Sequence, residues 1–449
     1  MVSEGGTVTN GTSGAYDDVA IGRPIINTTG SSGGTNSLTL RNGGRLFGGS
    51  VVIGGGWELS GASASTITKN NAYNVGGFGA ASLATNDAIT IYGHLNRLTV
   101  TNASLLSGTA IIGCFGCSNT ATVLADGTWD LRGNTLNVGY VNGNADNAFA
   151  NVVTVNGGIL TNVQWAAVGT APGVGGGNGS AWTNGLVILN GGRFHSGNVT
   201  IGDRNIASPG SGYRNYYNVG GGGISSIVSN GLITIGNNAA SNNTMTVTNA
   251  NVWSRGLTVG NGASKNSVVV LADSVWTLLN QNIVVGTNAA VGNTVTLSGG
   301  TMTNVNELRI GITNSSVGNR VTLSDGGKLF VAGAIAVGHS PGCSNNAFNI
   351  GGAGASSTVS NGAEFGVGGL LGGAYGCSSN TVTVTNANVC SGRLIVGNGH
   401  SFNTVRVLAG AAWNVATNGV GITTGFNDGA TGNVVVISGG TVTNAGLVR

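Results

Sequence analysis

The chain has 449 residues, of which 84 are Gly, 4 are Pro and 7% are charged, and its formal net charge is +3. This composition argues against an ordinary helical or α/β protein, and 40% hydrophobic residues argue against a disordered chain. The basic residues are dispersed, so no basic stripe of the kind that binds nucleic acid is present. There is also no run of about 18 apolar residues, so we expect no membrane-spanning helix.

An opening motif, Asn followed by apolar residues two and four positions later, recurs along the chain. Asn293, for example, is followed by Val295 and Leu297. Alternation with a period of two is typical of a strand that buries one face. The openings lie at Asn36, Asn71, Asn96, Asn119, Asn151, Asn184, Asn215, Asn243, Asn266, Asn293, Asn319, Asn346, Asn380, Asn403 and Asn433, at spacings of about 23 to 35 residues.

Each opening leads to a closing apolar run that ends in Gly, as in Val285-Gly286 and Ile310-Gly311. A unit of about 27 residues with two or three short strands cannot bury its apolar face alone, so it must stack on copies of itself. We therefore predict an all-β protein, a parallel β-solenoid of about 15 coils. Gly after the closing strand suits a corner with positive φ, and Asn there tolerates left-handed backbone and can form amide ladders between coils.

A longer period indicates duplication of a block of five coils. The motif reads NAYNVGG from Asn71, NYYNVGG from Asn215 and NAFNIGG from Asn346. Because no linker interrupts the series, we predict one elongated domain over residues 1–449. Its super-repeat pieces are 1–70, 71–214, 215–345 and 346–449.

The motifs at the two ends and the N-terminal residues indicate how the chain is continued and where it is located. The first and last recognisable motifs belong to the same coil of the block, and neither end shows a capping coil, so we expect a longer array or head-to-tail stacking. The N-terminal residues do not resemble a signal peptide, which indicates a removed signal or an internal piece. A polar surface with little charge favours an extracellular or cell-surface location.

Three Trp residues recur in the third coil of each block: Trp129, Trp276 and Trp413. In Trp129-Asp-Leu131 and Trp413-Asn-Val415 the polar residue alternates with apolar ones, which predicts that Trp lies on the inner face. The alternative is an outward aromatic row that stacks on sugars.

Outward Thr residues, such as those of Thr381-Val-Thr383, raise the idea of a flat ice-binding array. Arg320, Arg406 and Val269 stand at equivalent positions in other coils and break that array. A solvated strand face is therefore the favoured interpretation.

Five Cys residues are present. Cys343 and Cys377 lie in consecutive coils, where stacking can bring their Cα atoms within the disulfide range of about 4.4–6.8 Å. Cys114 and Cys117 have CxxC spacing, but neither a following helix nor a second CxxC supports a redox or zinc site. Structural thiols or one Cys343–Cys377 disulfide are therefore favoured over a metal.

Other residues that carry chemistry are too sparse to predict an active site. The four His residues lie in different coils, and Asp126 and Asp273 occupy the same turn five coils apart, too far for an acid/base pair. The Gly-rich loops are not followed by a predicted helix, whose N-terminus a phosphate-binding loop requires, so we do not expect them to bind phosphate. We expect no enzyme activity, no metal and no cofactor.

These Asn-x-Val-x-Val, GGTVTN and Val-Gly-Asn motifs, which cover essentially the whole chain, resemble the repetitive stalks of large bacterial surface proteins, adhesins and autotransporter passengers built as parallel β-helices. The resemblance implies a structural stalk or filament segment, adhesive or self-associating end to end. No C-terminal membrane barrel of an autotransporter is present in these residues. The alternatives are a carbohydrate-binding or carbohydrate-processing β-helix, with surface polysaccharide as partner, and an ice-binding solenoid.

Overall fold

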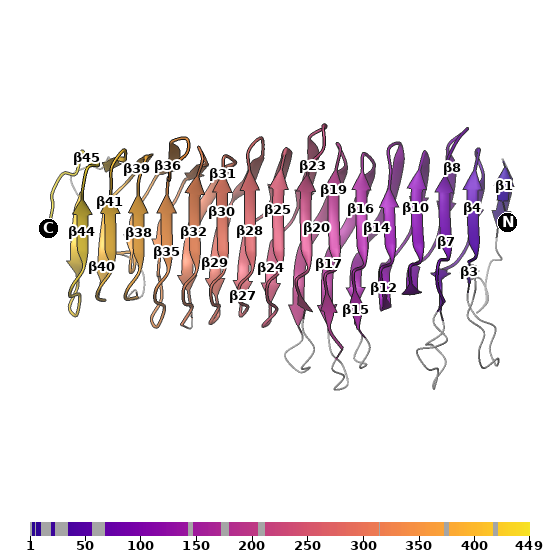
Figure 1. Cartoon of the computed structure of the whole chain (residues 1–449), viewed down its shortest axis with the longest axis horizontal. Coiled ribbons are helices and arrows are strands. Elements are labelled where there is room, and N and C mark those ends of the chain that lie inside the picture. The colour runs from indigo at the N-terminus through magenta and orange to yellow at the C-terminus, as the bar shows by residue number, and fades with distance from the viewer. Residues whose placement is uncertain are drawn as a thin grey trace. The chain divides into compact units, whose positions relative to one another are not determined.

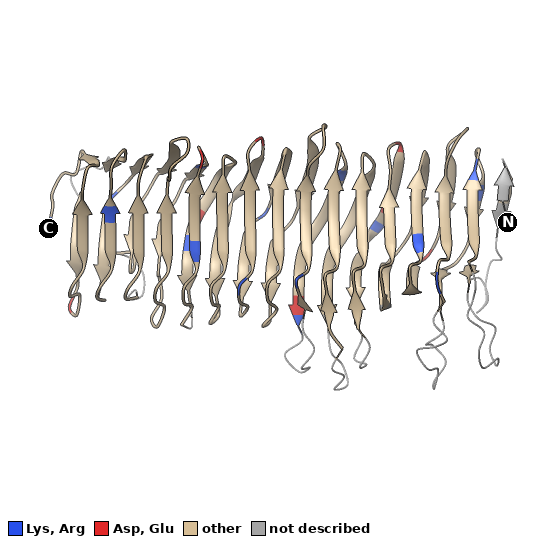
Figure 2. Ribbon diagram, in the orientation of Figure 1, with Lys and Arg blue, Asp and Glu red and all other residues tan. Residues whose placement is uncertain are grey.

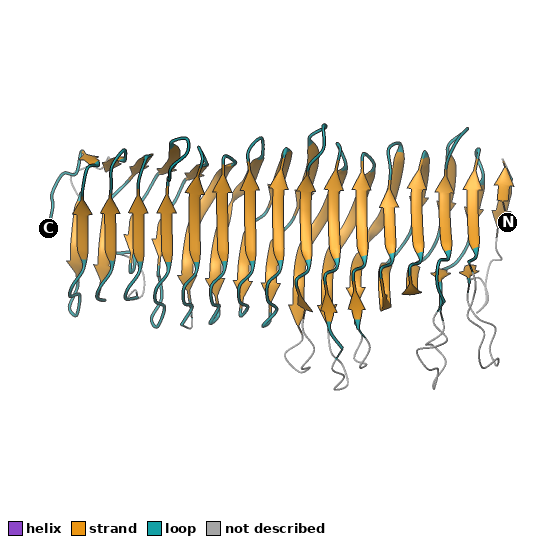
Figure 3. Ribbon diagram, in the orientation of Figure 1, coloured by secondary structure: helices purple, strands orange, loops and turns teal. Residues whose placement is uncertain are grey.

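The computed structural model describes residues 2–4, 6–9, 19–22, 35–55, 68–141, 147–171, 179–204, 212–313, 315–371, 377–415 and 421–449. The chain folds as two compact units, Met1–Asn230 and Gly231–Arg449. Strands joined by short loops make up both units (Figure 3). No helix in the described parts is long and apolar enough to cross a membrane.

A first sheet in each unit is formed by the strands that follow the recurring Asn. Its strands lie side by side within the unit (Figure 1) and pair in parallel with the strand of the next coil. In the first unit they are β1 (Val2–Glu4), β4 (Ser37–Arg41), β7 (Ala72–Gly76), β10 (Arg97–Thr101), β13 (Thr120–Val123), β16 (Val152–Asn156), β19 (Gly185–Leu189) and β22 (Tyr216–Gly220). In the second unit they are β25 (Thr244–Thr248), β28 (Ser267–Leu271), β30 (Thr294–Ser298), β32 (Arg320–Ser324), β35 (Ala347–Ile350), β38 (Thr381–Val384), β41 (Thr404–Val407) and β44 (Val434–Ile437).

The return path of each coil supplies the other sheet, either as two short strands or as one long strand. In the first unit these are β2 (Thr7–Thr9), β3 (Val19–Ile21), β5 (Arg45–Phe47), β6 (Val51–Ile53), β8 (Ser82–Thr85), β9 (Ile89–His94), β11 (Ala103–Leu106), β12 (Ala110–Cys117), β14 (Gly127–Tyr140), β15 (Ala148–Phe149), β17 (Ile159–Ala171), β18 (Ala181–Trp182), β20 (Arg193–Arg204), β21 (Gly212–Tyr213) and β23 (Ser226–Asn230). Of these, β15, β18 and β21 follow the long strands as separate two-residue strands. In the second unit they are β24 (Ile233–Asn237), β26 (Ala250–Ser254), β27 (Leu257–Asn261), β29 (Val275–Thr287), β31 (Thr301–Ile312), β33 (Lys328–Val331), β34 (Ile335–Val337), β36 (Ser357–Asn361), β37 (Phe365–Val367), β39 (Ala387–Ser391), β40 (Leu394–Asn398), β42 (Ala412–Val415), β43 (Ile422–Phe426) and β45 (Thr441–Thr443).

The core of each unit consists of apolar residues stacked directly on one another. In the second unit Val268 of β28 pairs with Val295 of β30, and Val270 pairs with Leu297. These four side chains are buried, whereas the residues between them on each strand are partly exposed. Burying an aliphatic side chain of this size contributes about 1.5–3 kcal/mol, so the period-two alternation of the sequence accounts for the core.

These features confirm the predicted parallel β-solenoid: each described strand pair is parallel, and within each unit the coils hydrogen-bond to one another. The division of residues 1–449 into one domain with pieces 1–70, 71–214, 215–345 and 346–449 stays a prediction. Charged residues are sparse over the described parts of both units (Figure 2).

Candidate functional site

An asparagine ladder runs along one corner of each unit and is the most regular polar feature of the fold. Its members are the first residues of the opening motifs. In the first unit they are Asn36, Asn71, Asn96, Asn119, Asn151, Asn184 and Asn215, and in the second unit Asn243, Asn266, Asn293, Asn319, Asn346, Asn380, Asn403 and Asn433.

Asn319 illustrates one rung of the asparagine ladder. Its Oδ1 accepts hydrogen bonds from the backbone N–H of Asn293 at 3.1 Å and from Nδ2 of Asn293 at 3.0 Å. Its Nδ2 donates to Oδ1 of Asn346 at 3.1 Å and to the carbonyl oxygen of Ala290 at 3.2 Å. Since Asn319 is completely buried, these bonds replace the water that its amide loses on folding.

The closing Gly of an earlier coil packs against the asparagine ladder. Gly286 has a φ of 80°, and a Cβ built there would lie 2.2 Å from Cγ of Asn319. The same contact recurs between Gly260 and Asn293 and between Gly311 and Asn346. Gly is therefore needed at this corner both for its backbone conformation and for space.

Left-handed backbone occurs beside the asparagine ladder, at the residue immediately before a ladder Asn. Lys265, for example, has a φ of 57° and Ala150 has a φ of 55°. Described ladder residues such as Asn266 and Asn151 do not have positive φ. The predicted ladder and the predicted left-handed corner are thus both present, but on adjacent residues.

The three predicted core Trp residues lie inside the coils. Trp129 and Trp276 are completely buried and Trp413 is 1% exposed. Each indole Nε1 donates to the Oγ of a Ser 22 residues earlier: Trp129 to Ser107 at 2.9 Å, Trp276 to Ser254 at 2.9 Å and Trp413 to Ser391 at 2.8 Å. Rings enclosed in this way present no face to a sugar in solution.

Cys343 and Cys377 come together from adjacent coils, whose residues Ser344 and Ser378 pair in parallel. Both are free thiols, and both are buried. A hydrogen bond from Cys377 lowers the pKa of Cys343 to about 7, and the Cys377 thiol lies 2.9 Å from the carbonyl oxygen of Ser340. Their proximity agrees with the sequence analysis, while the disulfide itself stays a prediction.

The two residues with CxxC spacing, Cys114 and Cys117, differ in burial and in their contacts. Cys114 is buried, whereas Cys117 is half-buried and lies against His94 of the preceding coil. Nδ1 of His94 is 2.7 Å from Sγ of Cys117, and the backbone N–H of Cys117 donates to the same nitrogen at 3.2 Å. This thiol–imidazole pair was not predicted from the sequence.

This pair belongs to a line of side chains that we name the corner row, defined as the residue two positions before each ladder Asn. In the first unit its described members are paired coil to coil and are at least partly exposed. They are Lys69, His94, Cys117, Phe149, Trp182 and Tyr213.

The last three members of the corner row in the first unit are stacked aromatic rings. The centroids of Phe149 and Trp182 are 4.8 Å apart with planes inclined by 7°, and those of Trp182 and Tyr213 are 5.8 Å apart with planes inclined by 10°. Beneath the stack, the small residues Ala148 and Ala181 are buried. Stacked pairs of this kind contribute about 0.5–1.5 kcal/mol each beyond the area that they bury.

In the second unit the corner row carries only small residues. Its members are Ser241, Ser264, Val291, Val317, Ser344, Ser378, Ser401 and Thr431. Coils therefore also stack with Ser, Val or Thr at this position, and stacking does not require the cation, imidazole, thiol and aromatic rings of the first unit. A count of residue types two positions before each recurring Asn would have revealed this contrast from the sequence.

The outer face of the first sheet holds Thr rows that are interrupted. Thr294 pairs with Arg320, and Thr383 pairs with Arg406. The expected break in a flat Thr array is therefore present in the register of the strands.

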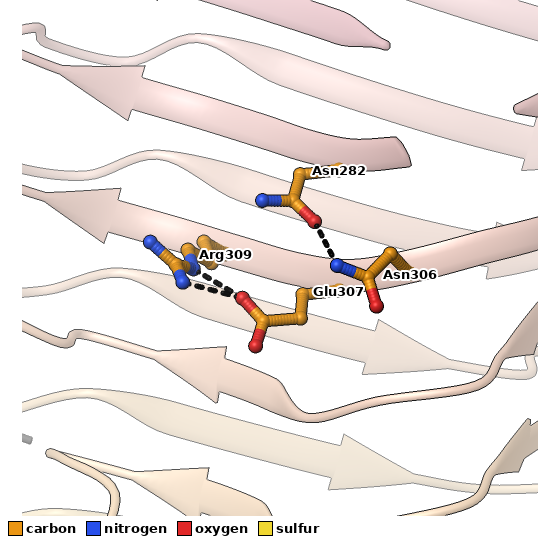
Figure 4. A network of polar contacts seen from close by, with 4 residues as sticks. All are labelled: Asn282, Asn306, Glu307 and Arg309. Carbon is orange, nitrogen blue, oxygen red and sulfur yellow. Dashed lines mark hydrogen bonds and ion pairs between the residues drawn. The ribbon is translucent and has the colours of Figure 1, made fainter. Parts of the chain in front are cut away.

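A small charged cluster lies on β31 of the second unit (Figure 4). Glu307 forms an ion pair with Arg309, whose Nε lies 2.7 Å from a Glu307 carboxylate oxygen, and Asn306 donates to Asn282 at 3.0 Å. Burial and the nearby Arg309 lower the pKa of His339. Both partners of the ion pair are partly exposed, so this pair contributes little to stability.

Within the described residues no group of three or more His, Cys, Asp or Glu side chains could hold a metal ion. No protein-family model matches the chain, and comparisons with curated proteins and with solved structures give no match. The geometry of the coils is therefore the basis on which a function can be proposed.

Proposed function

We propose that the chain is a structural segment of an extracellular stalk or filament, built from stacked β-coils and able to associate end to end. The asparagine ladder and the aliphatic core support this proposal. Both consist of the same contact repeated from coil to coil, which gives stiffness and length without requiring a ligand. The sparse surface charge and the likeness of the repeats to those of bacterial adhesins and autotransporter passengers favour a cell-surface setting (Figure 2).

The observation that carries the proposal is that each coil covers the core of the coil before it. Ile437 of β44 pairs with Val407 of β41, and Val407 is completely buried because β44 covers it. Ile437 itself is 52% exposed, although it occupies the same inward position. The same covering contact could be supplied by a coil of this chain or of another copy, because unpaired strand edges pair readily with other chains.

Sedimentation velocity and electron microscopy of the purified chain test the proposal. We expect particles that lengthen with protein concentration, and Ile437→Lys should abolish the lengthening because it places a charge at an inward position of β44. The matched control is Val436→Lys, since Val436 pairs with Arg406 and its outward position already accommodates a cation. Monomers at every concentration, or equal association of the two variants, would refute end-to-end stacking.

A second candidate function, carbohydrate binding, is favoured by one observation, the half-exposed stack of Phe149, Trp182 and Tyr213. Aromatic rings with polar edges are suited to contacts with sugar hydroxyls and C–H groups. Binding of the chain to a glycan array, lost in Trp182→Ala but retained in Trp276→Phe, would support this function. No binding above background by the wild-type chain would exclude it.

A further inference from the structure

The pair formed by His94 and Cys117 carries a function that the structural role does not use. Of the five Cys residues, Cys114, Cys343 and Cys377 are buried and Cys390 is exposed. Cys117 is half-buried and has an imidazole nitrogen 2.7 Å from its sulfur. A thiol and a base within hydrogen-bond reach are the arrangement that activates a cysteine nucleophile.

The direction of the hydrogen bond follows from the backbone. The backbone N–H of Cys117 donates to Nδ1 of His94, so Nδ1 is the unprotonated nitrogen and the thiol must be the donor. Register fixes the pair, because His94 at the end of β9 and Cys117 at the end of β12 are opposite each other in adjacent coils. The ring nitrogen is therefore positioned to receive the thiol proton.

The surroundings keep this pair neutral at rest. Burial raises the pKa of the Cys117 thiol, which a hydrogen bond with Ser118 and the charge of Lys69 partly oppose. Burial and then Lys69 lower the pKa of the His94 imidazole. Lys69 pairs with His94 in the corner row, and the next titratable side chains are Tyr92 on β9, Cys114 on β12 and Tyr140 on β14. A neutral thiol beside a neutral imidazole is ready for base-assisted attack.

We propose that Cys117, with His94 as its general base, is a thiol–disulfide exchange site that accepts small disulfides from solution. Nδ1 of His94 takes the proton of the thiol as the sulfur attacks one sulfur atom of the incoming disulfide. The S–S bond of that disulfide breaks, a mixed disulfide with Cys117 forms, and the departing thiolate takes the proton from His94. One disulfide is consumed and one is formed, so no further oxidant is needed.

The corner row supports this assignment. At the same position in the second unit the residues are Ser, Val or Thr, so coil stacking requires neither the thiol nor the imidazole. Phe149 follows Cys117 in register and Lys69 precedes His94, which places the pair between an aromatic ring and a cation. The proposal is independent of the stalk function, so the failure of one would not contradict the other.

The test is the reaction of the folded chain with 4,4′-dithiodipyridine between about pH 6 and pH 8, with the modified residue identified by peptide mass spectrometry. General-base assistance contributes a factor of about 10²–10⁴, so Cys117 should react at least about tenfold faster than exposed Cys390 at pH 6.5. Cys117→Ser should remove the fast phase. His94→Gln should slow Cys117 by about tenfold or more and leave the rate of Cys390 unchanged.

The pH profile of the wild-type chain gives a readout that needs no variant. Between the two pKa values of the pair the rate at Cys117 should be flat, because the proton stays within the pair, whereas an unassisted thiol loses about tenfold per pH unit below its pKa. A Cys117 rate that falls with this slope, or that does not exceed the rate of Cys390, would overturn the proposal. An unchanged Cys117 rate in a folded His94→Gln variant would do the same.

Discussion

Gly286 and Asn319 are in contact across two coils: a Cβ on Gly286 would lie 2.2 Å from Cγ of Asn319 and 2.3 Å from its Nδ2. The side chain of Asn319 can move away only by giving up hydrogen bonds that are buried. The Gly of each closing motif and the Asn of a later opening motif are therefore one structural element, although about thirty residues separate them in the sequence.

Gly286→Ala should lower the free energy of unfolding by about 3–5 kcal/mol, because Ala is disfavoured at positive φ and its methyl group displaces Asn319. Gly318→Ala is the control. Gly318 also has a positive φ, of 69°, but a Cβ there meets nothing within 4 Å. That variant should lose only about 1–2 kcal/mol. Urea denaturation monitored by circular dichroism measures the free energy of unfolding of both variants. Equal losses of stability in Gly286→Ala and Gly318→Ala would contradict the contact between Gly286 and Asn319.

Asn319→Ala should destabilise the second unit by about 3–5 kcal/mol, since it leaves the donors of Asn293 without an acceptor in a buried position. Asn388→Ala, at an exposed position, should change stability by less than about 0.5 kcal/mol. Asn319→Asp keeps the shape of the side chain but replaces Nδ2, which donates to Ala290 and Asn346, with an oxygen. It should therefore also be strongly destabilising. Denaturation midpoints of the three variants provide the measurement.

Phe348→Tyr should stabilise the second unit by about 1 kcal/mol. In the first unit the hydroxyl groups of Tyr73 and Tyr217 each lie 3.2 Å from Oδ1 of an Asn 13 residues later. At the third equivalent place Phe348 has no hydroxyl group, and Oδ1 of Asn361 is buried without a partner. Differential scanning calorimetry should show a higher Tm for Phe348→Tyr and a lower one for the reciprocal variant Tyr217→Phe. A decrease for Phe348→Tyr would mean that the ring has no room for the hydroxyl group.

The chain should lose stability as the pH falls below about 6.5. Burial lowers the pKa values of His94, His195 and His339, with additional effects of Lys69, Arg193 and Arg309 respectively. The unfolded chain therefore binds protons that the folded chain does not, so stability rises with pH through the window that ends at the ordinary pKa of His. The Tm should be lower at about pH 5.5 than at about pH 7.5, and His195→Gln with His339→Gln should reduce the difference. A Tm independent of pH in wild type would contradict this.

The architecture could be read from the sequence because it depends on repetition. The alternation at Asn293, Val295 and Leu297 predicts a half-buried strand, and its recurrence predicts the stack. The enclosed position of Trp276 also follows from alternation. Its hydrogen bond to Ser254 joins two coils, however, so predicting that bond would have required the register between the coils.

The corner row was not predicted, for a physical reason. Repetition identifies what coils share, whereas His94, Cys117 and Trp182 differ from one coil to the next and stand where other coils have Ser or Val. The 2.7 Å contact between His94 and Cys117 depends on which residues are opposite each other in adjacent coils. The recurring Asn places these two residues at the same position of their coils, but the structure was needed to show that this position is aligned between adjacent coils.

The hydrogen bonds between successive Asn residues of the asparagine ladder all have the same direction. Asn36 donates to Asn71 in the first unit, and Asn403 donates to Asn433 in the second, so each of these Oδ1 atoms accepts a hydrogen bond from the coil before it. Each unit therefore has chemical polarity: along the ladder, donation runs toward the coil that follows in the sequence. Two copies related by a twofold axis would set like groups against each other, so any contact that continues the ladder must be heterologous and must propagate in one direction.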